Sequence, residues 1–125
     1  MREVEVNNLK ELIEYKHYRR VSAYAWDIFS SMNEDEKELL GKPFVSSIDM
    51  VGANISKAFC HSDNYKRIEF YTNAIVLLSE GLDHWLKLIK KRNIVSKTTY
   101  EGMLELSNPL VLKMKSRISS CNDIK

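Results

Sequence analysis

The feature that most restricts the possible folds of this chain is a regular apolar stripe between residues 68 and 89. Its side chains recur at alternating steps of three and four residues: Ile68, Tyr71, Ile75, Leu78, Leu82, Trp85 and Ile89. Such steps place side chains on one face of an α-helix, whereas a half-buried strand would need alternation at every second residue. The stripe therefore predicts a long amphipathic helix, which we place at residues 63–92, packed against other helices.

Three further segments show helical periodicity, and we expect helices at residues 8–32, 43–60 and 96–118. Amphipathic helices joined by short connections are typical of an antiparallel bundle. A chain of 125 residues has the length of one domain. The sequence thus predicts an all-α fold with a single domain, residues 1–125, arranged as an antiparallel up-down-up-down four-helix bundle.

Two prolines and the polar chain ends limit these helices. Pro43 is compatible with the first turn of a helix, so residues 34–40 are expected to form a separate short turn before it. Pro109 removes a backbone hydrogen bond and is expected to kink or split the last helix. The ends, about 1–7 and 119–125, are expected to be frayed.

Polar residues mark the expected helix starts. Asn33 followed three positions later by Glu36 predicts a capping box. For the next two helices the alternative caps are Ser62 or Asp63, and Ser96 with Thr99 or Thr98 with Glu101.

Two of the expected helices carry more apolar surface than the core of a four-helix bundle requires. The first helix has a second stripe formed by Tyr15, Ser22, Trp26 and Phe29. The 63–92 helix has a second stripe formed by Phe70, Ala74, Leu77, Gly81 and Leu88. Contiguous apolar surface that a monomer would leave exposed marks contact with another protein, so we expect a homo-oligomer.

The formal charge is small but unevenly distributed. Nineteen Lys and Arg residues oppose 17 Asp and Glu residues, which argues against a strongly cationic nucleic-acid binder. Residues 64–125 nevertheless contain 11 basic and 6 acidic side chains. The candidate nucleic-acid contacts are Lys87, Lys90, Lys91, Arg92 and Lys97, together with Arg19 and Arg20 of the first helix. An oligomer repeats such patches and can bind phosphates multivalently, while the alternative is that they only complement helix dipoles and aid solubility.

The sequence offers no arrangement of catalytic or metal-binding residues. A di-metal bundle needs Glu-x-x-His pairs on two helices, and the nearest match is Glu80 with His84, four residues apart. Cys60 and His61 are adjacent, so their side chains point apart. A glycine-rich phosphate loop and a nucleophile elbow are also missing. We therefore expect no enzymatic activity, no catalytic residue, no metal and no cofactor.

The same sequence indicates a cytoplasmic location. Two cysteines cannot form a disulfide framework, which favours a reducing compartment. We find no signal peptide or lipidation motif. The longest apolar run, Ala74–Leu78, is far shorter than the ~20 residues of a membrane-spanning helix, so no membrane partner is expected.

The segment 41–55 reads GKPFVSSIDMVGANI. It resembles a motif of the small four-helix-bundle proteins related to those encoded by intervening sequences in bacterial large-subunit ribosomal RNA genes. The similarity continues through Ala25–Ile28, Ile68–Tyr71 and Lys90–Ile94, and it covers roughly residues 10–118.

The resemblance implies a bacterial, cytoplasmic bundle that assembles as a homopentamer and is not an enzyme. The family includes accessory proteins of diversity-generating retroelements, so RNA or DNA and a reverse transcriptase are the implied partners. An oligomeric adaptor that binds another protein without nucleic-acid affinity is the alternative.

The matched residues Asp49, Gly52, Ala53 and Asn54 are expected to pack and hydrogen-bond within a helix interface. Gly52 in the middle of a helix costs ~1 kcal/mol relative to Ala, which predicts a close approach by another helix. The stretch Ser56–His61 departs from the family pattern, in which an acidic residue and an arginine are usual.

Overall fold

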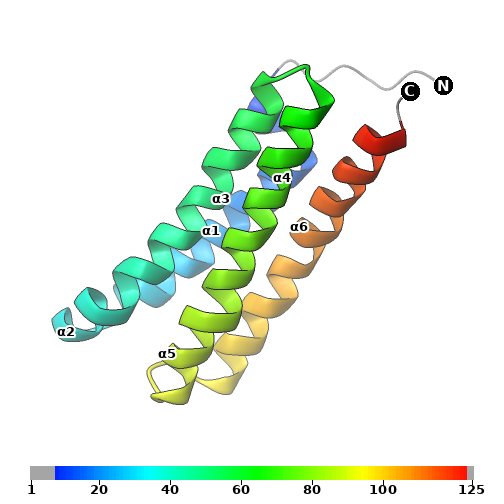
Figure 1. Ribbon diagram of the computed structural model, residues 1–125. Coiled ribbons are helices and arrows are strands. Elements are labelled where there is room, and N and C mark those ends of the chain that lie inside the picture. Colours follow the sequence, from blue (N-terminus) through cyan, green and yellow to red (C-terminus); the bar gives the residue numbers. More distant parts are fainter. Residues whose placement is uncertain (1–7, 124–125) are drawn as a thin grey trace.

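The computed structural model describes residues 8–123, and four long helical segments lie side by side (Figure 1). The longest α-helices are α1 (Ile13–Ser30), α3 (Lys42–Cys60), α4 (Asn64–Ser79) and α6 (Lys97–Asp123). The shorter elements are the 3₁₀ turn η1 (Leu9–Glu11), α2 (Glu34–Glu36), the π-helical segments η2 (Lys37–Gly41) and η3 (Glu80–Leu86), and α5 (Lys87–Lys91). Within residues 8–123 the fold is all-helical, as predicted.

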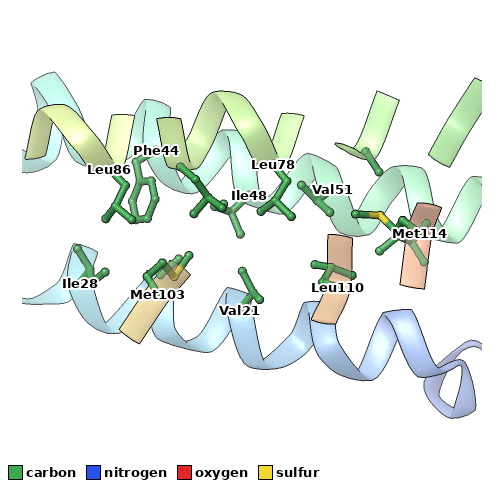
Figure 2. Close-up of a cluster of buried hydrophobic side chains, with 14 of the residues drawn as sticks. Val21, Ile28, Phe44, Ile48, Val51, Leu78, Leu86, Met103, Leu110 and Met114 are labelled. Carbon is green, nitrogen blue, oxygen red and sulfur yellow. The ribbon is translucent and has the colours of Figure 1, made fainter. Parts of the chain in front are cut away.

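One hydrophobic core fills the space between the four segments. In pairs, α1 packs on α3, α3 on α4, α4 on α6, and α6 on α1. Figure 2 shows buried side chains that converge from all four: Val21, Ile28, Phe44, Ile48, Val51, Leu78, Leu86, Met103, Leu110 and Met114. The apolar stripes of the sequence thus become the inner faces of the bundle.

The predicted break before Pro43 is a π-helical segment instead of an interruption. The chain is helical without a gap from Glu34 to Cys60, because η2 joins α2 to α3. At its end the Lys42 N–H bonds to the Lys37 carbonyl, five residues earlier, as in a π-helix. Pro43 follows in the first turn of α3, where its missing N–H is tolerated.

A second π-helical segment, η3, lies within the 68–89 stripe and adds Leu86 to its buried residues. The extra residue of a π turn rotates the side chains relative to an unbroken α-helix. Leu86 is 0% exposed, whereas Trp85, which the periodicity places on the stripe, is only partly buried. Leu82 and Ile89 are buried as predicted, and Trp85 is partly buried and packs against the core.

The helix starts settle the open capping alternatives. Asn33 and Glu36 form both hydrogen bonds of the predicted capping box. Asp63, and not Ser62, caps α4 by accepting from the Tyr65 N–H at 3.0 Å. At α6 the Ser96 hydroxyl accepts from the Thr99 N–H at 3.0 Å, which selects Ser96 with Thr99.

Both ends of the described chain differ from the prediction. The helix expected at 8–32 is divided, since Leu12 has extended backbone angles between η1 and α1. Pro109 lies inside α6, which continues without a split to Asp123. Residues 119–123, where fraying is expected, are helical, and Cys121 among them is buried. The expected fraying of 1–7 and 124–125 lies outside the described residues.

No helix in residues 8–123 is both long enough and apolar enough to cross a membrane.

Candidate functional site

Five of the seven basic residues predicted to bind nucleic acid lie in α5 and around the start of α6, at one end of the bundle (Figure 1). The side chains of Lys87, Lys91, Arg92 and Lys97 are exposed. Lys90 is partly buried, with its ammonium group 5.2 Å from the centre of the Tyr100 ring. Among the described residues, none of the five predicted basic residues here forms an ion pair. The charges of the four exposed residues are therefore available to a ligand.

The connection between α5 and α6 is held by specific backbone geometry. Asn93 has a φ of 59°, in the left-handed region that asparagine tolerates better than most residues. Its N–H bonds to the Lys90 carbonyl at 2.9 Å, and the Ile94 N–H bonds to the Ile89 carbonyl at 3.2 Å. These two bonds form a Schellman motif, which fixes the direction in which the chain leaves α5.

A pocket of about 360 Å³ lies between α1 and this connection. Its residues are Tyr24, Asp27, Ile28 and Ser31 from α1 and its C-cap, and Ile94, Val95, Ser96 and Thr99 from the connection and α6. The Tyr24 hydroxyl donates to the Thr99 carbonyl at 2.9 Å and closes one wall. Residues from distant parts of the chain build this pocket, so sequence periodicity does not reveal it.

Arg19 and Arg20, the other two candidate contacts, lie in the middle of α1 and are exposed. Arg19 borders a shallow hollow on α1 together with Tyr15 and Trp26. Arg20 precedes Tyr24 by four residues, which is ~6 Å along a helix axis. The structure thus brings together the basic residues near α5 and places Arg19 on a different surface, beside an apolar groove.

That groove lies between α1 and α3, and it contains Trp26 and Phe29 from the second apolar stripe of the first helix. A hollow of about 460 Å³ is lined by Trp26, Phe29, Lys42, Val45, Ser46, Asp49, Met50 and Ala53. Trp26 is 55% exposed and stacks on Phe29 with ring centres 5.0 Å apart. Met50 is also among the exposed large apolar side chains. A tryptophan and a methionine left in water beside a groove mark a surface suited to binding a protein.

Three of the four motif residues, Asp49, Gly52 and Ala53, lie on the side of α3 that faces α1. A Cβ atom on Gly52 would overlap the ring of Tyr18, so this glycine allows the tyrosine to lie directly against the helix. The Asn54 side chain donates to the Met50 carbonyl of its own helix at 2.9 Å, and Ala53 lines the groove. The helix approach expected at Gly52 is therefore made by one aromatic side chain.

Two neighbouring side chains at the contact between α1 and α3 have shifted pKa values. Partial burial raises the pKa of Asp49. Burial is also the largest cause that raises the pKa of Tyr18, followed by a hydrogen bond from Ser22 that lowers it and the nearby charge of Asp49 that raises it. Both shifts favour the uncharged forms, consistent with a partly desolvated contact between α1 and α3.

A buried polar cluster, which the sequence does not predict, joins α1, α4 and α6. The side chain of Glu14 has no exposed surface and accepts a hydrogen bond from the Tyr71 hydroxyl. Arg117 donates to both oxygens of the same carboxylate. Burial raises the pKa of Tyr71, and so do the hydrogen bond and the charge of Glu14, while the charges of Arg117 and Arg67 lower it.

Sequence periodicity could have suggested this cluster only indirectly. Glu14 lies seven residues before Val21, and that spacing places it on the inner face of α1. An acid at such a position requires a buried partner. Its partner is 103 residues away in the chain, which spacing within one helix cannot identify.

The remaining chemistry-bearing residues are dispersed. Within the described part of the chain, no group of three His, Cys, Asp or Glu side chains is arranged to hold a metal ion. Cys60 is exposed and Cys121 is buried, and both are free thiols. His61 stacks on Phe70 with ring centres 5.1 Å apart.

Comparison with known proteins identifies a shared fold. The chain is similar to a crystal structure of a protein with unknown function from the S23 ribosomal protein family of Bacteroides thetaiotaomicron, with a TM-score of 0.78 and 18% sequence identity. The alignment covers 86% of this chain and 96% of the other. No family model and no curated protein matches the sequence. The chain thus has the fold of that bacterial protein, and the family suggested by the 41–55 segment stays a prediction.

Proposed function

We propose that this protein is a non-enzymatic, oligomeric four-helix-bundle protein of the bacterial cytoplasm that binds nucleic acid through the basic residues around the end of α5. The observation that carries the proposal is the gathering of Lys87, Lys91, Arg92 and Lys97 at one end of the bundle, exposed and without ion pairs among residues 8–123. Phosphate groups are the natural counter-ions of such a surface.

The proposed topology is antiparallel, up-down-up-down. Two contacts between α1 and α6 support it. Glu14 near the start of α1 bonds to Arg117 near the end of α6, and Tyr24 near the end of α1 bonds to Thr99 near the start of α6. The start of one helix thus contacts the end of the other in both cases, as two antiparallel helices require.

Self-association is supported by the groove between α1 and α3. Trp26 and Met50 remain exposed there, although similar side chains elsewhere are packed in the core. We propose that another copy of the chain covers this groove, with five copies per assembly as the sequence resemblance implies. Such an assembly presents several copies of the basic end. A long phosphate backbone that contacts more than one copy binds more tightly than it would to a single chain.

The test compares a charge-reversed protein with the wild type. In the variant Lys91→Glu, Arg92→Glu and Lys97→Glu, three exposed side chains change sign at the basic end. The control Lys16→Glu, Lys57→Glu and Lys115→Glu changes three exposed lysines elsewhere, with the same change in net charge. Binding of a structured RNA is measured by light scattering at low and at moderate salt.

The proposal expects a wild-type oligomer that becomes heavier with RNA, and a complex that weakens steeply as salt increases. The control should retain most of this binding and the basic-end variant should lose it. Equal retention by both variants would exclude the basic end as the binding surface.

A second candidate function is an oligomeric adaptor that binds another protein, such as a reverse transcriptase, and has no affinity for nucleic acid. The apolar character of the groove beside Trp26 favours this candidate, because phosphate backbones need charged partners. An oligomer whose mass is unchanged by RNA at low salt would support it over the first.

A further inference from the structure

We propose that the pocket between α1 and the α5–α6 connection binds an unpaired guanine base, with Asp27 accepting hydrogen bonds from its Watson–Crick edge. This inference rests on the proposed nucleic-acid function and specifies what the basic end recognises. It assigns a single-stranded or bulged region as the ligand, since a paired guanine has no free Watson–Crick edge.

The size and the walls of the pocket suit a planar base. Its volume of about 360 Å³ falls within the ~300–1,000 Å³ of typical small-molecule sites. Ile28, Ile94 and Val95 supply apolar surface, and Tyr24 supplies an aromatic ring. The Schellman motif at Asn93 and the cap at Ser96 hold the connection in place before any ligand arrives. A preformed pocket loses little conformational entropy when it binds.

The polar groups of the pocket present mainly acceptors. Tyr24 donates its hydroxyl proton to the Thr99 carbonyl, and Ser31 donates to the Ile28 carbonyl at 2.7 Å. Ser96 donates to the Thr99 hydroxyl at 3.0 Å. The carboxylate of Asp27 has no hydrogen-bond or ion-pair partner among residues 8–123. Its two oxygens are therefore available for a ligand that offers N–H donors.

Guanine is the base that fits a free carboxylate. It presents two adjacent donors, N1–H and the exocyclic amine, which can meet both oxygens of Asp27. Adenine and cytosine each place an acceptor nitrogen beside the amine, and that nitrogen would face a carboxylate oxygen. Uracil offers one N–H between two carbonyls, which the carboxylate repels.

The positive charges beside the pocket suit the phosphate backbone of a nucleic acid whose guanine enters it. Arg92 lies two residues before Ile94, and Lys97 directly follows Ser96. Both are exposed, and each is within a few residues of a group that lines the pocket. A strand whose base enters the pocket would bring its phosphates to these cations, which combines base recognition with the sequence-independent attraction.

The test measures fluorescence anisotropy with three short, labelled RNA strands of equal length and charge. One is all adenine, the second has a single central guanine, and the third has inosine in place of that guanine. We expect the guanine strand to bind roughly ten-fold tighter than the adenine strand, and inosine, which lacks the exocyclic amine, to lie between them.

The variant Asp27→Asn should abolish this preference and leave the adenine strand bound as before or slightly better. Asp35→Asn, an exposed acid on α2, is the matched control and should preserve the preference. Equal binding of the three strands by the wild type would overturn the guanine pocket while leaving the proposed nucleic-acid function intact.

If none of the strands binds, the proposed function fails and the pocket is tested alone. Guanosine monophosphate is then titrated while the methyl resonances of Ile94 and Val95 are followed by NMR. Chemical-shift changes that are lost in Asp27→Asn would support guanine binding in the pocket. If the nucleotide causes no such changes, the inference is overturned. Stronger shifts with N-acetylarginine amide would assign the pocket to an arginine side chain of a protein partner and also overturn the inference.

Discussion

Arg117 donates two hydrogen bonds to the carboxylate of Glu14, with Nε 2.9 Å from Oε2 and Nη2 3.1 Å from Oε1. The two residues are 103 positions apart, and the acid has no exposed surface. This parallel pair of bonds connects the first and the last helix of the bundle. Because the carboxylate has given up its water, Arg117 and Tyr71 supply the interactions that water would otherwise provide.

Removal of one member of this pair should be strongly destabilising. Arg117→Met leaves the charge of Glu14 buried without its counter-ion, and we expect a loss of about 3–5 kcal/mol in the free energy of unfolding. Urea unfolding followed by circular dichroism measures the change. Arg20→Met on the exposed side of α1 is the control and should stay within ~0.5 kcal/mol of the wild type.

The double variant Glu14→Leu with Arg117→Met should recover most of that loss, since a buried ion pair can be replaced by apolar groups at little cost. If Arg117→Met is no more destabilising than Arg20→Met, the pair does not contribute to stability.

The raised pKa of Tyr71 predicts sensitivity to alkaline pH. Its phenol is held neutral in the folded protein by burial and by Glu14, whereas in the unfolded chain it ionises near the ordinary value of 10.0. The folded state therefore retains the proton more tightly, and the stability contributed by Tyr71 is lost as the pH rises above 10. Ultraviolet absorbance of tyrosinate should show no contribution from Tyr71 until the protein unfolds.

Tyr71→Phe provides the comparison for this titration. While both proteins remain folded, their tyrosinate absorbance should rise by the same amount, because Tyr71 does not contribute. A smaller rise in Tyr71→Phe would mean that the residue ionises in the folded state, contrary to its position.

Gly52 and Tyr18 should be energetically coupled. Gly52→Ala introduces a Cβ that overlaps the Tyr18 ring, and we expect a net loss of stability because overpacking costs ~1–3 kcal/mol. In a Tyr18→Ala background the space is open, and the same substitution should stabilise by up to ~1 kcal/mol since alanine favours a helix over glycine. A double-mutant cycle from thermal unfolding measures this coupling. An effect of Gly52→Ala that is the same in both backgrounds would rule it out.

Trp26→Glu should disrupt the proposed assembly. A carboxylate placed in the groove would have to be desolvated in the interface, which disfavours association. We expect light scattering to give a mass near the 14.6 kDa of one chain, with the helical circular dichroism unchanged. Leu112→Glu, which replaces another exposed apolar residue on α6, should keep the wild-type mass. A Trp26→Glu protein that stays oligomeric would place the subunit contact elsewhere.

The local signals in the sequence predict much of this fold. The apolar stripes identify the four helical segments, and the capping box at Asn33 forms as expected. These features depend on residues within one or two helical turns of each other, which a single sequence displays directly. The two π-helical segments are not predicted, because the periodicity of apolar residues does not distinguish a π turn from an α turn.

Much less of the candidate sites is predicted, because they depend on contacts between distant residues. The basic residues from Lys87 to Lys97 are neighbours in sequence, so their gathering at one end follows from the chain itself. The pocket beside them depends on how Asp27 approaches Ile94, and no periodicity encodes that distance. Likewise, the position of Arg117 two residues after Lys115 suggests an exposed cation, although Arg117 bonds to a buried acid.

The contact between Glu14 and Arg117 also has a consequence for folding during translation. When α1 leaves the ribosome, the arginine that neutralises its buried acid has not yet been translated. Docking α1 early would bury a carboxylate without its counter-ion, so we expect the nascent helix to stay hydrated until α6 has been made. Limited proteolysis of stalled ribosome complexes should cleave within α1 until residue 117 has emerged. The last helix to be made thus decides when the first one folds.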